Sequence, residues 1–177
     1  MTRTVTRRCC ASLVLAAGLL TFGVAALADS AIAPTHPRAD RLLVLKSERK
    51  LLVLAGEEVL RTMDIALGLV PTGHKEREGD FRTPEGVYYL EAKNSESDYF
   101  LSLKVSYPNA ADRAHARQLG VDPGGQIMIH GLPNEPKYDE DLYRGWDWTD
   151  GCIAVSNSDM VDLWLMTSVS IPIEIRP

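Results

Sequence analysis

Short apolar runs separated by glycine, proline and polar residues constrain the fold of this chain more than any other feature. Leu- and Val-rich runs at 41–46 and 50–55 flank the polar residues 47–49, a pattern typical of a β-hairpin. Residues 59–67 come close to alternating apolar and polar side chains, which predicts a third strand. Five more strands are expected over 86–93, 100–106, 126–130, 152–156 and 170–175.

Two helices are expected among these strands. Asn109 can cap a helix over 110–119 that Gly120 stops, and Asn157 or Ser158 can cap a second one through Leu165. Because strands and helices do not alternate one by one, a βαβ fold is excluded. The prediction is a mostly β, α+β domain: a mixed, sandwich-like sheet with about two short helices.

Three further segments are expected to lack regular structure. Residues 68–86 carry glycines and prolines among charges, and so predict a long ordered loop, which is usually functional when it is not disordered. Residues 94–98 are expected to form a polar turn. Residues 132–148 contain two prolines, one glycine and two tryptophans, and are expected to be irregular.

The N-terminal residues resemble a secretory signal. Three arginines precede an apolar stretch over 11–28 that ends in the small-residue pattern Ala26-Leu27-Ala28. We therefore expect a signal peptide over 1–28, an N-terminal arm over 29–40 and one catalytic domain over 41–177. An uncleaved stretch serving as a membrane anchor stays open as the alternative. The expected location is the periplasm or the cell surface.

The net charge of the mature chain limits the kinds of partner that it can bind. Removal of residues 1–28 takes three of the 19 basic residues and none of the 24 acidic ones, so the remainder is clearly acidic. Such a surface argues against nucleic acid and anionic lipid as partners. It allows a carbohydrate or a peptide substrate.

Cysteine usage points to chemistry at one residue. Cys152 is the one cysteine of residues 29–177, so the exported chain cannot form an internal disulfide. An unpaired thiol in an oxidising compartment is open to oxidation, so its presence suggests use, although a buried and inert cysteine is an equal alternative for an isolated residue. A nucleophilic thiolate needs a base and oxyanion donors. His130 is the candidate base, and the backbone amides of Gly151 and Cys152 are the candidate donors.

A longer run of motifs carries a resemblance to a known family. Four motifs follow one another in the chain: Gly79-Asp80-Phe81-Arg82-Thr83-Pro84-Glu85-Gly86, Ser106-Tyr107-Pro108-Asn109, Ile129-His130-Gly131 and Thr149-Asp150-Gly151-Cys152-Ile153. In order and spacing they resemble the L,D-transpeptidase family with the YkuD-type catalytic domain. The resemblance extends from about Leu42 to Ile175.

This resemblance implies a mostly β catalytic domain without a metal or organic cofactor, acting on peptidoglycan stem peptides. The cysteine of such enzymes attacks the carbonyl of the third stem residue, expels the terminal D-alanine and forms a thioester. An amine of another stem peptide, a lysine of an outer-membrane lipoprotein or a free D-amino acid then accepts the acyl group, and water gives hydrolysis instead. Mapped here, Cys152 is the nucleophile, His130 the base and Gly151 part of the oxyanion site.

Two positions depart from the common family pattern. Asp150 stands where a His usually precedes Gly-Cys, and Ala154 stands where an Arg usually follows the cysteine by two positions. A guanidinium at position 154 could bind a carboxylate with two hydrogen bonds, so its absence leaves the mode of substrate binding and the choice of acceptor open. This version resembles the compact, periplasmic YafK-like branch, in which hydrolysis is also known, and both transfer and hydrolysis stay open.

Several other residues are candidates for substrate binding, each with a structural alternative. Asp150 could orient His130 or a substrate amine, or be a solvated turn residue. Arg82 could bind a stem carboxylate, or form a surface ion pair. The remaining candidates are Thr149, Gly131, Tyr107, Trp146 and Trp148, the tryptophans either lining a cleft or packing in the core.

Competing functions are weighed by residue type and order. The four histidines are scattered, so metal binding is not expected, and His74 and His115 are expected to be solvated. A papain-like protease would place its cysteine early and its histidine far downstream, the reverse of this chain. A non-catalytic cell-wall binding protein is the remaining alternative, against which Cys152 and His130 argue.

Overall fold

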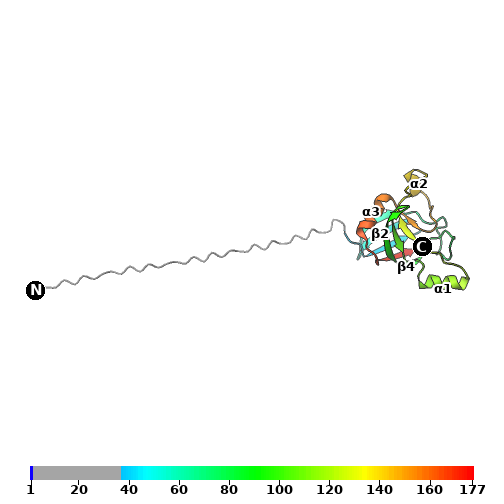
Figure 1. Cartoon of the computed structure of the whole chain (residues 1–177), viewed down its shortest axis with the longest axis horizontal. Coiled ribbons are helices and arrows are strands. Elements are labelled where there is room, and N and C mark those ends of the chain that lie inside the picture. The colour runs from blue at the N-terminus through cyan, green and yellow to red at the C-terminus, as the bar shows by residue number, and fades with distance from the viewer. Residues whose placement is uncertain (2–36) are drawn as a thin grey trace. The chain divides into compact units, whose positions relative to one another are not determined.

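The computed structural model describes Met1 and residues 37–177, in which three helices lie around strands (Figure 1). The predicted signal peptide and most of the predicted arm lie outside the described residues. The strands are β1 Arg41–Leu45, β2 Lys50–Ala55, β3 Glu58–Asp64, β4 Gly86–Ser97, β5 Phe100–Val105, β6 Met128–His130, β7 Ile153–Ala154 and β8 Pro172–Arg176. The helices are α1 Ala110–Leu119, α2 Glu140–Arg144 and α3 Asn157–Met166.

The expected mostly β, α+β class is confirmed, and two local predictions are wrong. The polar turn expected at 94–98 does not form, because β4 continues to Ser97. Its polar side chains are tolerated there since most of that half of the strand is exposed. The segment 132–148 contains the third helix, α2, whose Arg144 pairs with Glu140 one turn earlier. Its flanking prolines and glycine hid this short helix in the sequence.

Eight strands form one sheet in the order β3-β2-β1-β8-β4-β5-β6-β7. Most neighbours are antiparallel, but β1 with β8 and β6 with β7 are parallel, so the sheet is mixed. The first residues of β4 pair with β8, and the rest of the strand pairs with β5 across a register shift. Thus β4 passes from one half of the sheet to the other, which gives the sandwich-like arrangement.

The two outer strands of the sheet meet again beyond their ends. Ala66, just after β3, exchanges two backbone hydrogen bonds of 2.9 and 2.8 Å with Ala154 of β7. A second bridge joins Gly68 to Thr149. These contacts tie the segment after β3 to the residues on both sides of Cys152.

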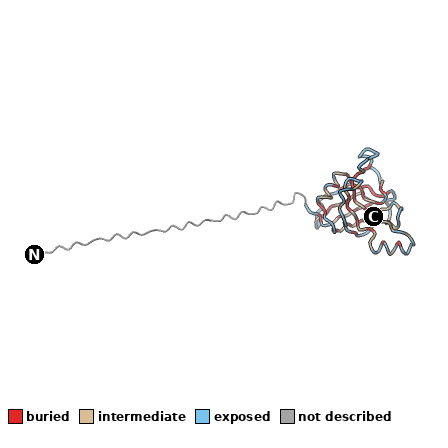
Figure 2. Tube along the Cα trace, viewed as in Figure 1, coloured by how far each residue is buried: buried red, intermediate tan, exposed pale blue. Residues whose placement is uncertain are grey.

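One apolar core fills the space between the two halves of the sheet. Val44 and Val53 of the first hairpin, Leu103 of β5 and Ile153 of β7 are completely buried in it. α3 covers it through Met160, Leu163 and Met166, and its side-chain cap is Ser156 rather than the expected Asn157 or Ser158. Burial of such side chains is the main stabilising contribution to a fold of this kind. Figure 2 shows the buried segments inside and the exposed ones along α1 and α2.

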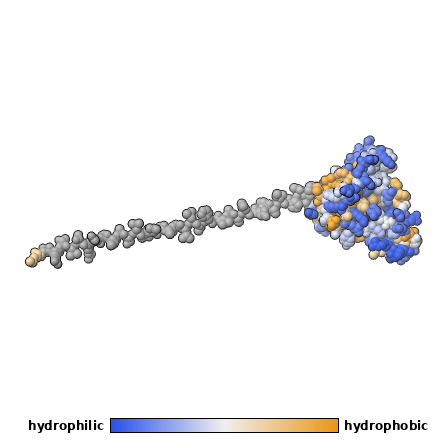
Figure 3. All heavy atoms as spheres, viewed as in Figure 1, coloured by the Kyte–Doolittle hydropathy of each residue, from blue (hydrophilic) through white to orange (hydrophobic). Residues whose placement is uncertain are grey.

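The first helix confirms its sequence signals. The Asn109 side chain accepts hydrogen bonds from the amides of Ala111 and Asp112, and the Asp112 carboxylate accepts one from the Asn109 amide. Gly120 ends the helix in a left-handed conformation. Most residues of α1 are exposed. The atoms around α2 are mostly hydrophilic in Figure 3. Among the described residues, no helix has the length and apolar character needed to cross a membrane.

Candidate active site

Two parallel strands bring Cys152 and His130 to the same cavity. In the register of β6 and β7, Ile129 lies opposite Ile153 and His130 opposite Ala154, so Cys152 and His130 point to the same face of the sheet. Both line a cavity of about 260 Å³. Cys152 and His130, which are 22 positions apart in the chain, therefore line one cavity, and their roles as nucleophile and base stay predictions.

The cysteine sits at the end of a tight turn that Thr149 holds closed. Thr149 Oγ1 donates to the Cys152 carbonyl at 2.8 Å and accepts from the Gly151 amide at 3.2 Å. The Thr149 backbone is fixed in turn by hydrogen bonds with Leu67 and Leu69. Thr149 is buried, lines the cavity and shapes the turn. Its hydroxyl accepts from the Gly151 amide and not from the Cys152 amide.

Glycine is required at two positions where this turn meets the loop 68–85. Gly151 has φ +124°, and a Cβ there would lie 2.6 Å from the Arg82 carbonyl oxygen. A Cβ on Gly68 would lie 2.1 Å from the Phe81 carbonyl oxygen and 3.1 Å from the Gly151 Cα. The backbone of the motif at 79–86 thus packs directly against the turn that carries Cys152.

The thiol of Cys152 is held by backbone groups. The Met128 amide donates to Sγ at 3.4 Å, and Sγ lies 3.6 Å from the Gln126 carbonyl oxygen, which can accept the S–H proton. Burial raises the pKa of the Cys152 thiol, and the nearby Asp150 carboxylate raises it further, while the Met128 amide acts in the opposite direction. The protonated thiol is therefore the favoured resting form.

His130 is buried and held in one tautomer. Its Nδ1 lies 2.7 Å from the Gly131 carbonyl oxygen, and because a carbonyl only accepts, Nδ1 carries the proton and Nε2 the lone pair. Burial lowers the pKa of His130, against the opposing effect of the Gly131 carbonyl. Tyr99 and Trp148 pack around the ring, with centroids 4.6 and 5.6 Å from it. A neutral imidazole beside a neutral thiol can act as a general base when the thiol attacks.

Two buried lysines hold the loop 68–85, one from the first hairpin and one from within the loop itself. Lys46 of the first hairpin turn donates to Glu85 at 2.7 Å and to the Gly73 and Thr83 carbonyls at 2.7 and 3.0 Å. Lys75 pairs with Asp80 at 2.8 Å, and both side chains are more than nine-tenths buried. The loop is therefore an ordered support, as the sequence predicted.

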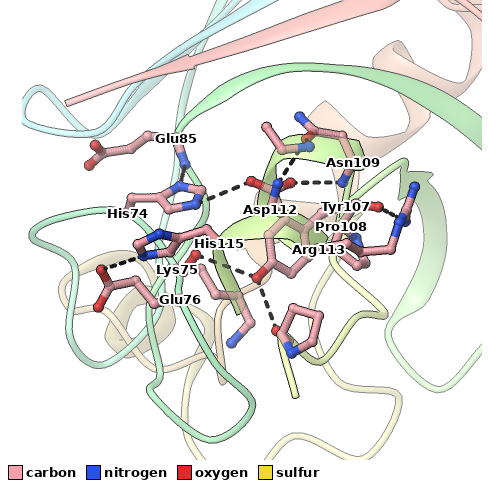
Figure 4. A network of polar contacts seen from close by, with 12 residues as sticks. His74, Lys75, Glu76, Glu85, Tyr107, Pro108, Asn109, Asp112, Arg113 and His115 are labelled. Carbon is pink, nitrogen blue, oxygen red and sulfur yellow. Dashed lines mark hydrogen bonds and ion pairs between the residues drawn. The ribbon is translucent and has the colours of Figure 1, made fainter. Parts of the chain in front are cut away.

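A second polar network ties this loop to α1 (Figure 4). His74 accepts from the Glu85 amide at 3.0 Å and lies 3.2 Å from the buried carboxylate of Asp112. The expectation of a solvated His74 is wrong, because both ring nitrogens have protein partners. His115 is largely exposed beside Glu76, as expected.

Several sequence-predicted binding residues lie away from the cavity. Tyr107 is buried, and its hydroxyl donates to the Pro123 carbonyl at 2.9 Å, so it anchors the loop before β6. Arg82 lies 3.6 Å from Glu76, the surface ion pair that was its alternative. Gly131 packs against Asn157 and Phe100, where a Cβ would lie 2.5 and 3.0 Å from their side chains.

Other candidates line cavities around Cys152. Trp148 and the exposed Asp150 lie on the wall of the cavity that holds the thiol, while Trp146 lines a neighbouring groove. Sequence reasoning missed five lining residues: Ser97, Tyr99, Ser102, Gln126 and Met128. Had the fourth strand been predicted to continue to residue 97, Ser97 and Ser102 would have been placed on neighbouring strands. Nothing in the sequence marks the other three. Among the described residues, no three His, Cys, Asp or Glu side chains are grouped to hold a metal ion.

Comparison with known proteins connects this geometry to a family. The L,D-transpeptidase catalytic domain (YkuD) model matches residues 39–175. The Escherichia coli K12 protein named "Putative L,D-transpeptidase YafK" is 39% identical over 61 residues, which are 33% of this chain and 23% of that protein.

Two solved structures share the fold. A variant of the helical cell shape determining protein Pgp2 from Campylobacter jejuni superposes with a TM-score of 0.57 at 25% identity, over 79% of this chain and 47% of that one. Bd1075 from Bdellovibrio bacteriovorus superposes with a TM-score of 0.55 at 27% identity, over 80% of this chain and 48% of that one. The chain thus spans about a quarter of YafK and about half of the two solved chains. The family match covers most of the sequence, and the chain belongs to the L,D-transpeptidase catalytic domain (YkuD) family.

Proposed function

We propose that the protein is a peptidoglycan L,D-transpeptidase that works through a thioester on Cys152. The observation that carries the proposal is the placement of Cys152 and His130 on one face of two parallel strands, at one cavity. Family membership supports peptidoglycan as the substrate class.

The first half-reaction follows from the neutral state of both groups. As Cys152 Sγ attacks the carbonyl of the third stem residue, the imidazole of His130 takes the thiol proton on Nε2. The C–S bond forms, the amide C–N bond breaks, and the imidazolium returns the proton to the departing D-alanine amine. The Cys152 amide is our candidate donor to the oxyanion, since the Gly151 amide already donates to Thr149.

The second half-reaction decides between transfer and hydrolysis. An amine attacking the thioester gives a cross-link, D-amino acid exchange or attachment of a lysine-bearing lipoprotein, and water gives hydrolysis. The exposed Asp150 on the cavity wall favours an amine, because a carboxylate attracts an incoming ammonium group. Hydrolysis by the same nucleophile is the second candidate, supported by the absence of the usual arginine at Ala154.

Product analysis tests both half-reactions. Purified tetrapeptide muropeptides are incubated with the protein, with and without an added D-amino acid, and the products are identified by mass. Exchanged or cross-linked products are expected. Loss of D-alanine with water addition alone would assign hydrolysis. Identical products from the wild type and Cys152→Ala would refute the proposal and leave the cell-wall binding alternative.

A further inference from the structure

A second hollow adjoins the cavity of Cys152. It is a groove of about 840 Å³, larger than the cavity of about 260 Å³ that holds the thiol. Tyr99 and Trp148 line both hollows, so they form the shared wall between them. A ligand that fills the groove therefore reaches the wall of the cavity that His130 and Cys152 line.

The groove is walled by aromatic rings that stay open to solvent. Trp146 and Tyr138 are each 52% exposed, and their rings meet edge to face with centroids 6.1 Å apart. Tyr143 lies behind them, buried, between Tyr138 at 6.0 Å and Trp148 at 5.1 Å. Exposed aromatic faces grouped in a hollow are typical of a binding site rather than of an ordinary surface.

The polar groups of the groove suit hydroxyl and amide groups. Asp98, Glu135 and Lys137 line it, and within residues 37–177 their side chains form no hydrogen bond or ion pair. Two acceptors and one donor beside flat rings match a pyranose, whose C–H faces pack on aromatic rings and whose hydroxyls bond to carboxylates and ammonium groups.

The spacing of the aromatic rings from His130 into the groove fits a sugar that carries a stem peptide. The ring centroids step from His130 to Trp148 by 5.6 Å and from Trp148 to Tyr143 by 5.1 Å, and Tyr138 is one further step away. An extended chain spans about 3.3–3.6 Å per residue, so three residues reach roughly 10 Å. A sugar linked to the first stem residue would lie in the groove while the third residue lies at Cys152.

We propose that this groove binds the sugar of the glycan strand that bears the stem peptide. The identity of the sugar rests on the proposed function, whereas the site itself rests on Trp146, Tyr138 and their polar neighbours. Recognition of the sugar would make the enzyme prefer stem peptides attached to glycan over free stem peptides.

Binding of a peptide-free sugar tests the site without turnover. The Cys152→Ala protein is titrated with an oligomer of N-acetylglucosamine, and binding is followed by calorimetry. Saturable binding is expected, weakened at least tenfold by Trp146→Ala and by Tyr138→Ala. Tyr89→Ala is the matched control, because Tyr89 is also 52% exposed but lies on β4 outside the groove, and it should bind like the parent.

Kinetics in the active enzyme separate a sugar site from a peptide site. With muropeptides that keep the sugar, Trp146→Ala should raise KM at least tenfold and leave kcat nearly unchanged, whereas with the free tetrapeptide it should change neither. Absence of saturable sugar binding, or equal binding by all variants, overturns the proposal. An equal rise of KM for the free tetrapeptide overturns it in favour of a peptide site. Sugar binding without any turnover of muropeptides would instead refute the proposed function alone.

Discussion

At the scale of single residues, the proposed chemistry depends on which of Cys152 and His130 carries the proton. Burial acts on both groups in the direction that removes charge, raising the pKa of the thiol and lowering the pKa of the imidazole. The resting pair is therefore neutral rather than a thiolate–imidazolium ion pair. In the proposed reaction, the thiol is therefore activated during attack, with Nε2 of His130 as the acceptor of the proton.

The raised thiol pKa predicts an alkaline reactivity profile. The thiolate fraction grows as pH rises through the pKa, so the rate of iodoacetamide alkylation at Cys152 should still increase above about pH 8.5, where an ordinary thiol is half ionised. Alkylation rates measured from pH 5 to 10 check this. A plateau at or below neutral pH would contradict it, because it would indicate a preformed ion pair.

Asp150 contributes to the same profile. Its carboxylate raises the pKa of Cys152, so Asp150→Asn should lower that pKa and accelerate alkylation at neutral pH severalfold. The control is Asp141→Asn, since Asp141 has a 95% exposed side chain on α2 and should leave the profile unchanged. A slower or unaltered reaction in Asp150→Asn would show that this charge does not act on the thiol.

Gly151 is the position at which an added side chain should disturb the site most. Gly151→Ala adds a Cβ 2.6 Å from the Arg82 carbonyl oxygen at a positive φ, so the turn of Cys152 must shift. Displacement of about 1 Å at a reacting group costs on the order of 100-fold in rate, and we expect at least that loss in kcat/KM.

Alanine at a second glycine, Gly56, serves as the control, because it places a Cβ at a positive φ without a steric clash. Gly56 has φ +57° in the turn before β3, and a Cβ there meets nothing within 4 Å. Gly56→Ala should cost about 1–2 kcal/mol of stability and leave kcat/KM unchanged. Equal kcat/KM in the two variants would contradict a supporting role for the loop beneath Cys152.

At the scale of elements, the loop 68–85 connects the sheet to the turn of Cys152. Its chain contains no strand or helix, yet Lys46 holds its carbonyls from the sheet side and Asp80 holds its own amides from within. Burial raises the pKa of Asp80, but the hydrogen bonds from Lys75 and from three backbone amides outweigh it and lower the pKa below its usual value.

Loss of the Asp80 charge should loosen this loop. Asp80→Asn leaves Lys75 buried without its partner, and breaking a buried pair costs about 3–5 kcal/mol. Since the folded state lowers the pKa of Asp80, the carboxylate stabilises the fold above its unfolded pKa of about 4 and loses this effect as pH falls through the lowered value. Denaturant unfolding at pH 7 and pH 3 checks both points. The gap between wild type and variant should shrink at pH 3, and a gap that widens there would refute the assignment.

The sequence predicted most elements because their signals are local. Asn109 and Gly120 bound α1 through backbone hydrogen bonds of neighbouring residues, which a sequence displays directly. Tyr99 and Gln126 could not be found in this way, since they reach the cavity only through the pairing of β5, β6 and β7. Trp146 and Trp148 illustrate the same limit. The sequence predicted one cleft for both, whereas Trp146 lines only the groove and Trp148 lines the groove and the cavity of Cys152.

At the scale of the whole molecule, closure of the sheet sets the position of Cys152, the proposed nucleophile. Ala66 and Ala154 join the segment after β3 to β7, so the turn of Cys152 is held between the two ends of one sheet. The predicted strands gave the class of fold, but closure is a long-range pairing that no local signal marks. The candidate nucleophile and base were predictable from motif residues, and their shared cavity follows only from this topology.

Direct capture of the acyl-enzyme tests the central claim. The protein is mixed with a tetrapeptide muropeptide, quenched in acid within the first turnover and measured by intact mass and peptide mapping. We predict an adduct equal to the muropeptide without its terminal D-alanine, located on Cys152, released by hydroxylamine as a thioester and missing in Cys152→Ala. An adduct on another residue, or unchanged turnover in Cys152→Ala, would contradict the role of Cys152.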